Sequence, residues 1–127
     1  LGMQLLLNSS EEGSLPGLGW MDGTVRAFDF SRADTGSKRL AVPHMGWNAV
    51  TATQESTLTE SLDEKSKFYF VHSFYADLQA SENILLRSQY GHFFTSGIKK
   101  ENIYGLQFHP EKSHRHGMDI MKSFSSI

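Results

Sequence analysis

The clearest catalytic pattern lies near the end of the chain, where His109, Pro110 and Glu111 follow an apolar stretch. Pro110 disfavours helical geometry for His109, and residues two apart in an extended segment point to the same side, so His109 and Glu111 could lie close together. A carboxylate beside an imidazole is the geometry of a general base and the group that orients it. In such a pair His109 takes a proton from a nucleophile and returns it to a leaving amine, while Glu111 fixes the tautomer. The nucleophile has to come from elsewhere.

The same residues also fit purely structural roles. His109 can be a histidine at a strand end, and Glu111 a glutamate in a first helical turn, where the helix dipole favours negative charge. A metal site built from His109, His114, His116 and Glu111 is a further alternative. His114 and His116 are two apart on a predicted helix and would point away from each other, so we expect no metal ligands here.

Composition narrows the class of protein. The 127 residues include 12 basic and 14 acidic side chains scattered along the chain, for a net charge of −2. Such a balance offers no electrostatic footprint for nucleic acid or an anionic membrane, and no apolar run or leader marks the chain for insertion or export. We therefore expect a cytoplasmic protein of one domain, with neither nucleic acid nor membrane as a partner. The absence of cysteine excludes a disulfide scaffold and thiol chemistry by these residues.

The elements that must position these side chains are mainly strands. Runs rich in aromatic and β-branched residues predict strands at residues 24–30, 47–53, 67–75, 83–88, 93–98 and 102–108. The run at 67–75 is the strongest of them, and Val25 and Ala27 are expected to face inward in the first. Residues 31–39 are polar and predict a loop.

Two helices complete the predicted set. Leu1, Leu5 and Leu6 predict a first helix within residues 1–7. From residue 113 onward apolar residues recur at helical spacing, which predicts an amphipathic helix covering a sheet face. Those residues are Met118, Ile120, Met121 and Phe124. The fold class is therefore α/β.

Two motifs at opposite ends of the chain carry a family resemblance. Residues 105–113, Gly-Leu-Gln-Phe-His-Pro-Glu-Lys-Ser, resemble the His-Pro-Glu segment of class I glutamine amidotransferases residue for residue. In that family the nucleophilic cysteine is followed by Leu-Gly-Met-Gln, which stands here as residues 1–4. The resemblance implies that residues 1–127 are the C-terminal part of an open mixed sheet flanked by helices. We expect a partial domain that lacks the N-terminal part with the nucleophile and the oxyanion strand.

Within the family, residues 43–48 and 70–75 look like the glutaminase subunits of imidazole glycerol phosphate synthases. This resemblance implies hydrolysis of the glutamine side-chain amide through a thioester, without a cofactor. The ammonia would pass to a (β/α)8-barrel cyclase subunit, the partner in a heterodimer of histidine biosynthesis. A paralogous subunit for surface-sugar amination would share these motifs, and a docking module without catalysis is the other open alternative.

The resemblance also assigns roles around the substrate. Leu1 matches the backbone donor next to the nucleophile, which stabilises the oxyanion. Gln4 matches a residue that contacts the substrate glutamine, and the alternative is a solvated helix residue. His72, Ser73 and Phe74 match the segment that holds the amino and carboxylate ends of the substrate, and the alternative is a buried strand end.

A last group of residues matches the surface that meets the barrel subunit. Met45 and Trp47 would suit an interface core, and Lys112 could pair with a carboxylate of the partner. The alternatives are core packing for Trp47 and a solvated Lys112. The full group is Pro43, His44, Met45, Gly46, Trp47, Asn48 and Lys112. Because the missing strands would leave others without neighbours, we also expect exposed strand edges and an exposed apolar patch.

Overall fold

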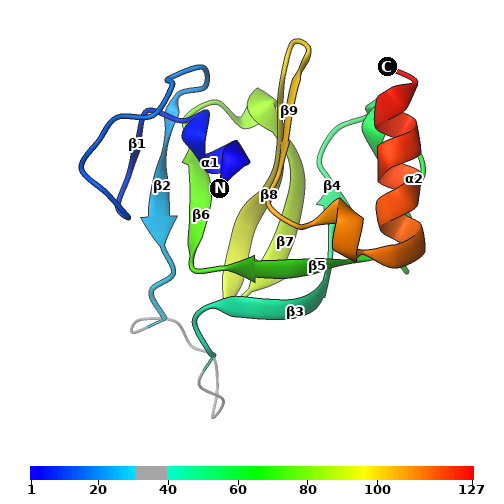
Figure 1. The fold of residues 1–127 in the computed structure, drawn as a ribbon, viewed down its shortest axis with the longest axis horizontal. Helices are drawn as coiled ribbons and strands as arrows, with labels where there is room; N and C mark the ends of the chain where they lie inside the picture. Colours follow the sequence, from blue (N-terminus) through cyan, green and yellow to red (C-terminus); the bar gives the residue numbers. More distant parts are fainter. Residues whose placement is uncertain (31–39) are drawn as a thin grey trace.

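Strands dominate the regular structure of residues 1–30 and 40–127, which the computed structural model describes (Figure 1). The larger sheet has the strand order β1-β2-β6-β8-β7-β4, with β9 paired to β8, and β3 and β5 form a second sheet. The predicted loop at residues 31–39 lies outside the described residues. The strands are β1 Ser9–Ser10, β2 Gly23–Ala27, β3 His44–Ala49, β4 Thr51–Ala52, β5 Lys67–His72, β6 Phe74–Leu78, β7 Ile84–Tyr90, β8 His92–Lys100 and β9 Ile103–Leu106.

Both pairing directions occur in the larger sheet. Strands β1 and β2 are parallel, whereas β2–β6, β6–β8, β7–β8, β8–β9 and β4–β7 are antiparallel. The hairpin between β7 and β8 turns at Gly91, whose φ of 75° lies in the left-handed region that glycine tolerates. A mixed sheet with a few helices agrees with the predicted α/β class.

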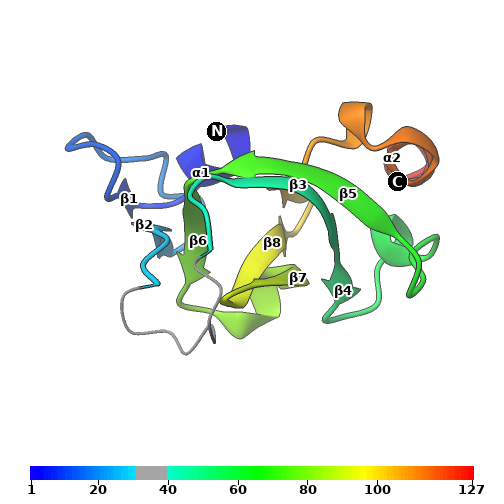
Figure 2. The same ribbon diagram turned by 90° about the horizontal axis from the view of Figure 1, so that it is seen from below.

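The strongest predicted strand is in fact two strands that belong to different sheets. The run at residues 67–75 breaks at Ser73: β5 pairs with β3, whereas β6 pairs with β2 and β8. Figure 2 shows β3 and β5 as a layer over β6, β8 and β7. Since neither glycine nor proline marks the break, the change of pairing partner explains it, and the local sequence does not.

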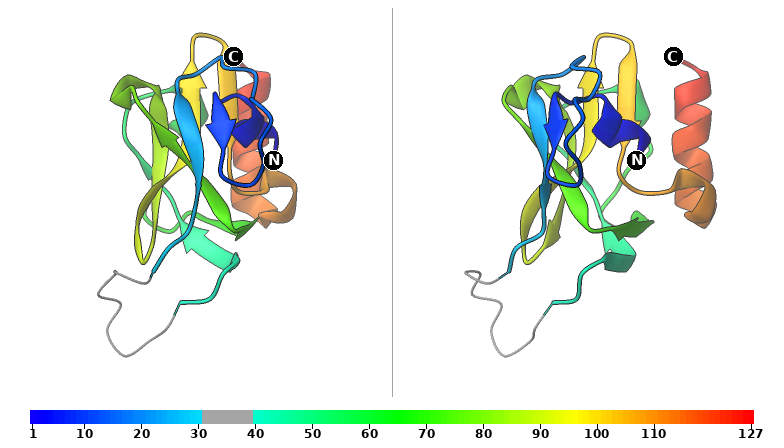
Figure 3. Two further views of the ribbon diagram at one scale, coloured as in Figure 1. Left: turned by 90° about the vertical axis from the view of Figure 1, so that its left-hand side faces the viewer. Right: turned by 60° about the vertical axis from the view of Figure 1, so that its left-hand side comes forward.

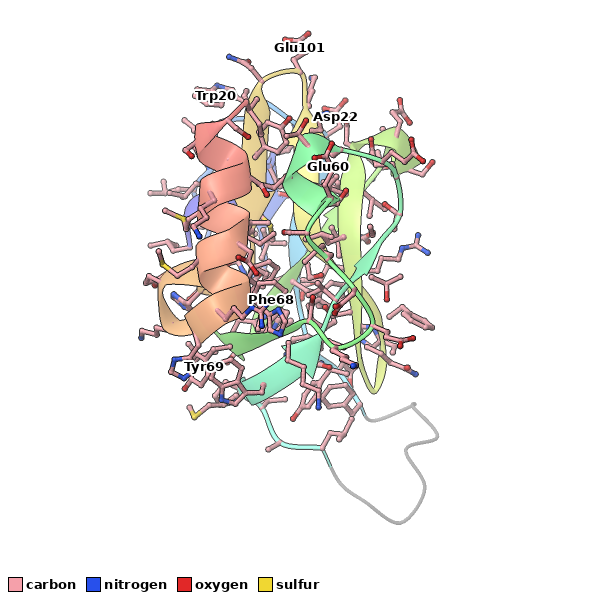
Figure 4. The ribbon with its side chains drawn as sticks, turned by 90° about the vertical axis from the view of Figure 1, so that its right-hand side faces the viewer. Trp20, Asp22, Glu60, Phe68, Tyr69 and Glu101 are labelled. Atoms are coloured by element: carbon pink, nitrogen blue, oxygen red, sulfur yellow. The ribbon has the colours of Figure 1, made fainter. Side chains whose placement is uncertain are left out.

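The main core lies between the two sheets. Phe68 and Phe70 of β5 are fully buried and pack with residues of β7, β8 and the segment after β9. Figure 4 labels Phe68 and its neighbour Tyr69, which is partly exposed, as expected for successive residues of a strand. Burying each phenylalanine side chain stabilises the fold by about 1.5–3 kcal/mol.

A smaller apolar cluster joins the start of the chain to the larger sheet. Met3 of helix α1 (Gly2–Leu5) is buried against Val25 of β2 and Ile98 of β8. The predicted first helix is thus present, but shorter than residues 1–7. Val25 faces inward as predicted, whereas Ala27 is exposed, because β2 ends there and Phe28 fills the core instead.

Helix α2 (His114–Ser125) is present as predicted but buries little of its apolar surface. Ile120 and Gly117 are buried, while three apolar side chains predicted to face the sheet are more than half exposed. At about 100° per residue, Met121 and Phe124 lie within about 40° of the buried Gly117 on the helix. Their exposure therefore reflects how few elements pack against α2, the 3-10 helix Thr57–Thr59 and β5 among them, and not a separate helix face. Figure 3 shows α2 standing at one side of the sheet, opposite β1. The three exposed apolar side chains of α2 are Met118, Met121 and Phe124.

Open strand edges and exposed apolar side chains are both present, whereas an apolar patch formed by those side chains stays a prediction. Within the described residues, β9 pairs with β8 alone, and β1 with β2 alone. Leu1 and Leu15 are more than four-fifths exposed, and further large apolar side chains of the first 20 residues are at least half exposed. No helix in residues 1–30 and 40–127 is both long enough and apolar enough to cross a membrane.

Candidate functional site

His109 lies where β9 has ended and the chain turns towards α2. Its φ of −101° and ψ of 97° are extended, as the following Pro110 requires. Pro110 then opens the 3-10 helix Pro110–Lys112. The backbone N–H of His109 donates to the carbonyl oxygen of Tyr69, 3.0 Å away, which anchors this turn to β5.

The structure brings His109 and Glu111 together. Nδ1 of His109 lies 2.8 Å from Oε1 of Glu111, and the two side chains are 37% and 63% exposed. The extended backbone expected for residues 109–111 was wrong, since Glu111 lies in a 3-10 turn. The turn still places the Glu111 carboxylate beside Nδ1 of His109. The pKa of Glu111 is lowered by its own backbone N–H and then by the hydrogen bond from His109. With Nδ1–H donating, a neutral imidazole keeps Nε2 as its proton acceptor.

Ser113 and Gly117 hold this turn and were missed by the sequence analysis. The buried Ser113 Oγ donates to the carbonyl oxygen of His109 at 2.6 Å and accepts from the backbone N–H of Tyr69 at 3.0 Å. A Cβ on Gly117 would lie 1.8 Å from the carbonyl oxygen of Pro110. Gly117 itself was a usable signal, because a glycine inside a helix destabilises it by about 1 kcal/mol relative to alanine and therefore suggests a close contact at that position.

A pocket of about 500 Å³ opens beside His109. Its walls come from α1, the corner between β5 and β6, and the segment that leads from β9 to His109. All the residues predicted to act on the substrate or the oxyanion line it, whereas Glu111, which contacts His109, is not among the lining residues. The lining is Leu1, Gly2, Met3, Gln4, Glu12, Val71, His72, Ser73, Phe74, Leu106, Gln107, Phe108 and His109.

Gln4 is fixed in this pocket by hydrogen bonds, so the solvated alternative does not hold. Its Nε2 donates to the carbonyl oxygen of Phe74 at 3.1 Å and to Oε1 of Gln107 at 3.0 Å. Both amide hydrogens are thereby used, and Oε1 of Gln4 is its remaining polar atom. Gln107 is buried and was not among the predicted site residues, although a polar residue between Leu106 and Phe108 in an apolar run was a usable signal.

His72 lines the pocket from the corner between β5 and β6, but its ring is directed into the core. Nδ1 contacts the carbonyl oxygen of Phe74 at 2.8 Å, and Nε2 contacts Nδ1 of His44 at 2.9 Å. Burial lowers the pKa of both imidazoles to about 4, and at His44 the neighbouring His72 adds to the effect. Both rings are therefore neutral near neutral pH.

The residues predicted to meet a partner are only partly on the surface. Met45 is 62% and Trp47 48% exposed, and Pro43 and Lys112 are exposed as well. The Trp47 ring stacks on His114, with centroids 5.2 Å apart. His44 departs from the expectation: its side chain is buried in the core, because β3 turns alternate residues inward.

No metal centre is found in the part of the chain that the structure describes. There, no group of three or more His, Cys, Asp or Glu side chains is placed to hold a metal ion. His114 stacks on Trp47, whereas the ring of His116 lies 6.2 Å from that of Phe68.

With this geometry in place, comparison with known proteins decides the family. A family model described as glutamine amidotransferase class-I matches residues 1–126. The chain belongs to the class I glutamine amidotransferases. The resemblance at residues 1–4 and 105–113 is thus confirmed at the level of the family.

Several curated class I amidotransferase relatives carry one name, imidazole glycerol phosphate synthase subunit HisH. The relative from Leptospira borgpetersenii is 45% identical over 127 residues, which is all of this chain and 61% of the relative. HisH 2 of Methanococcus maripaludis is 48% identical over 124 residues, or 98% of this chain and 58% of the relative. The relative from Bdellovibrio bacteriovorus is 47% identical, and the chain covers 61% of it. The chain therefore spans about three-fifths of the length of the curated relatives it matches.

Proposed function

We propose that residues 1–127 supply the acid–base and substrate-binding part of a glutaminase subunit of imidazole glycerol phosphate synthase. The observation that carries this proposal is the His109–Glu111 pair at the wall of a pocket in which Gln4 is held by Phe74 and Gln107. A base, its orienting carboxylate and an amide that can recognise another amide meet there. Glutamine is the substrate that suits this set.

In the proposed reaction, a cysteine thiol attacks the carbon of the glutamine side-chain amide. Nε2 of His109 takes the thiol proton and gives it to the leaving nitrogen, so that ammonia departs and a thioester remains. Water, deprotonated by the same nitrogen, then attacks the thioester carbon, and the C–S bond breaks to release glutamate while the proton returns to the sulfur. Glu111 holds the Nδ1–H tautomer of His109 and stabilises the imidazolium that forms.

The nucleophile of this proposal lies outside the 127 residues, which contain no cysteine. The resemblance at residues 1–4 supports a cysteine directly before the residue that matches Leu1. In that setting the backbone N–H of Leu1 would donate to the oxyanion. Gln4 Oε1 and the backbone of Ser73 and Phe74 would hold the substrate, since all of them border the pocket.

The proposed partner is a (β/α)8-barrel cyclase subunit that receives the ammonia, in a cytoplasmic heterodimer of histidine biosynthesis. The half-exposed Met45 and Trp47 and the exposed Lys112 support a docking surface near the pocket. Surface-sugar amination by a paralogue is the competing assignment. The shared HisH name of the relatives favours the histidine pathway.

The test uses a joined protein, in which residues 1–127 follow the segment of the L. borgpetersenii relative that precedes its matched residues. Glutamate release from glutamine is measured with and without the barrel cyclase subunit of that organism. We expect hydrolysis that the barrel subunit raises and that His109→Ala lowers about 10²–10⁴-fold. Lys122→Ala, on the exposed side of α2, is the control and should leave the rate unchanged.

Two outcomes would count against the proposal. If the joined protein binds the barrel subunit but hydrolyses no glutamine, a docking module without catalysis replaces the glutaminase. If hydrolysis occurs and His109→Ala leaves it unchanged, the pocket described above is not the catalytic site.

A further inference from the structure

Two histidines lie in the aromatic core and have no part in the proposed proton transfer. His44 of β3 and His72 of β5 are directly opposite each other in the antiparallel ladder, and they are 3% and 8% exposed. The His44 ring stacks on Tyr90 with centroids 4.0 Å apart, and Phe70 lies on it at 4.9 Å. Their surroundings are apolar rings, where an unpaired polar nitrogen is costly.

The hydrogen bonds of these rings can run in only one direction. A backbone carbonyl only accepts, so Nδ1 of His72 must donate to the oxygen of Phe74, 2.8 Å away. Because the ring is neutral, Nε2 of His72 is then an acceptor. Nδ1 of His44, 2.9 Å from it, must therefore be the donor.

The same reasoning continues to the surface end of the chain of bonds. With Nδ1 of His44 protonated, its Nε2 is an acceptor that faces Nδ2 of Asn48 at 3.3 Å. The second hydrogen on Nδ2 of Asn48 donates to the carbonyl oxygen of Gln89 at 2.8 Å. Each donor in the series meets an acceptor, and both rings carry their proton on Nδ1.

The other end of the series is a wall of the pocket. The carbonyl oxygen of Phe74 accepts from His72 inside the core and from Nε2 of Gln4 at 3.1 Å inside the pocket. A carbonyl oxygen has two lone pairs, and here one is used on each side. The position of this oxygen, and with it that of Gln4, is therefore set jointly by the core and the pocket.

We infer that His44 and His72 are positioning residues, which hold the Phe74 carbonyl and thereby the Gln4 amide in the geometry that binds the substrate. The inference rests on the proposed glutaminase function. Two apolar side chains would fill the core without any desolvation cost, whereas a fully satisfied polar series specifies one arrangement of the corner at Ser73.

The kinetic test uses paired variants of the joined protein. His44→Phe keeps an aromatic ring among Phe70, Tyr90 and Phe94 but leaves Nε2 of His72 without its donor. We expect it to raise the KM for glutamine about tenfold, with a smaller change in kcat. His44→Asn places an amide nitrogen near the position of Nδ1, and we expect it to restore much of the KM.

His92→Phe is the matched control. The His92 ring lies 5.6 Å from that of Phe28 in the same aromatic cluster, but its Nδ1 contacts the carbonyl oxygen of Phe93 and takes no part in the series. The same histidine-to-phenylalanine change should therefore leave KM unchanged. An unaltered KM in folded His44→Phe, or equal defects in His44→Phe and His44→Asn, would overturn the inference.

A spectroscopic test needs no substitution, so it decides even if the variants fail to fold. Long-range nitrogen–proton NMR spectra distinguish the two neutral tautomers of a histidine. His44 and His72 are expected to carry the proton on Nδ1, and a proton on Nε2 of either ring would contradict the series. Failure of the proposed function shows separately, as absence of hydrolysis in the unsubstituted joined protein.

Discussion

His109 and the His44–His72 pair place the same side chain in two opposite environments. His109 is partly exposed, lies beside a carboxylate and borders the pocket, which is the setting that the proposed proton transfer requires. His44 and His72 are surrounded by aromatic rings, and burial lowers their pKa to about 4. The contrast shows that a histidine count says little about catalysis, because the neighbours decide whether a ring exchanges protons or stays neutral.

The largest expected effect is on kcat and concerns His109, the partly exposed histidine. Glu111→Gln keeps the size of the side chain but removes the negative charge that favours the imidazolium of His109. We expect kcat of the joined protein to fall about 10²-fold, with little change in KM, because general acid–base groups contribute on that scale. Glu101→Gln, at the turn between β8 and β9, is the control. An undiminished kcat in Glu111→Gln would remove the carboxylate from the mechanism.

The buried side of the contrast predicts a dependence of stability on pH. Between pH 6.5 and about 4 the unfolded chain protonates His44 and His72 while the folded chain does not. The free energy of unfolding should therefore decrease as pH falls through this window, by about 1.4 kcal/mol per pH unit from each ring.

Denaturant titrations across the window measure this slope. His92→Phe should leave it unaltered, whereas His44→Phe removes one of the two rings and should lower it. A stability that stays level from pH 6.5 down to about 4 would mean that the two rings are not neutral in the fold.

A substitution in α2 tests the scaffold that carries His109. In Gly117→Ala the added Cβ would clash with the backbone oxygen of Pro110. Because the clash is with backbone, no side-chain movement can relieve it. We expect a loss of about 1–3 kcal/mol in the free energy of unfolding, together with a lower kcat. Gly13→Ala is the control, since nothing lies within 4 Å of its Cβ position. Equal stability of the two variants would mean that the 3-10 turn at Pro110 shifts to accommodate the added Cβ at no cost.

A smaller effect is expected from the hydroxyl that ties this turn to β5. Ser113→Ala leaves the backbone N–H of Tyr69 without its partner and releases the carbonyl of His109. The cost should be about 1–2 kcal/mol, in the range for a buried group left unpaired. Ser125→Ala, which removes an exposed hydrogen bond to Lys122, should cost less. Chemical denaturation of the two variants separates the cases.

The sequence predicted most of the strands because their aromatic and β-branched runs are long. It missed the corner at Ser73, since residues 67–75 are uniformly strand-forming and only the tertiary pairing divides them between β3 and β2. That corner forms one wall of the pocket. Periodicity likewise predicted that Met118 and Met121 of α2 would be covered by a sheet face, whereas both are more than half exposed.

The candidate site was predicted in part. His109 and Glu111 could be found because proline and their spacing limit how far apart the two side chains can be. Gln107 carried a sequence signal that the analysis did not use. The roles of Ser113 and His44 could not be predicted, because they arise from contacts with residues distant in the chain. Residue type alone does not tell whether a histidine is buried or on the surface, and only the fold distinguishes the two cases.

The central claim is that one pocket both binds glutamine through Gln4 and hydrolyses it through His109. The most direct test is to measure kcat and KM for glutamine in the joined protein and in its His109→Ala and Gln4→Ala variants. The account predicts that His109→Ala lowers kcat about 10²–10⁴-fold, whereas Gln4→Ala mainly raises KM. Unchanged values of kcat and KM in both variants would contradict it.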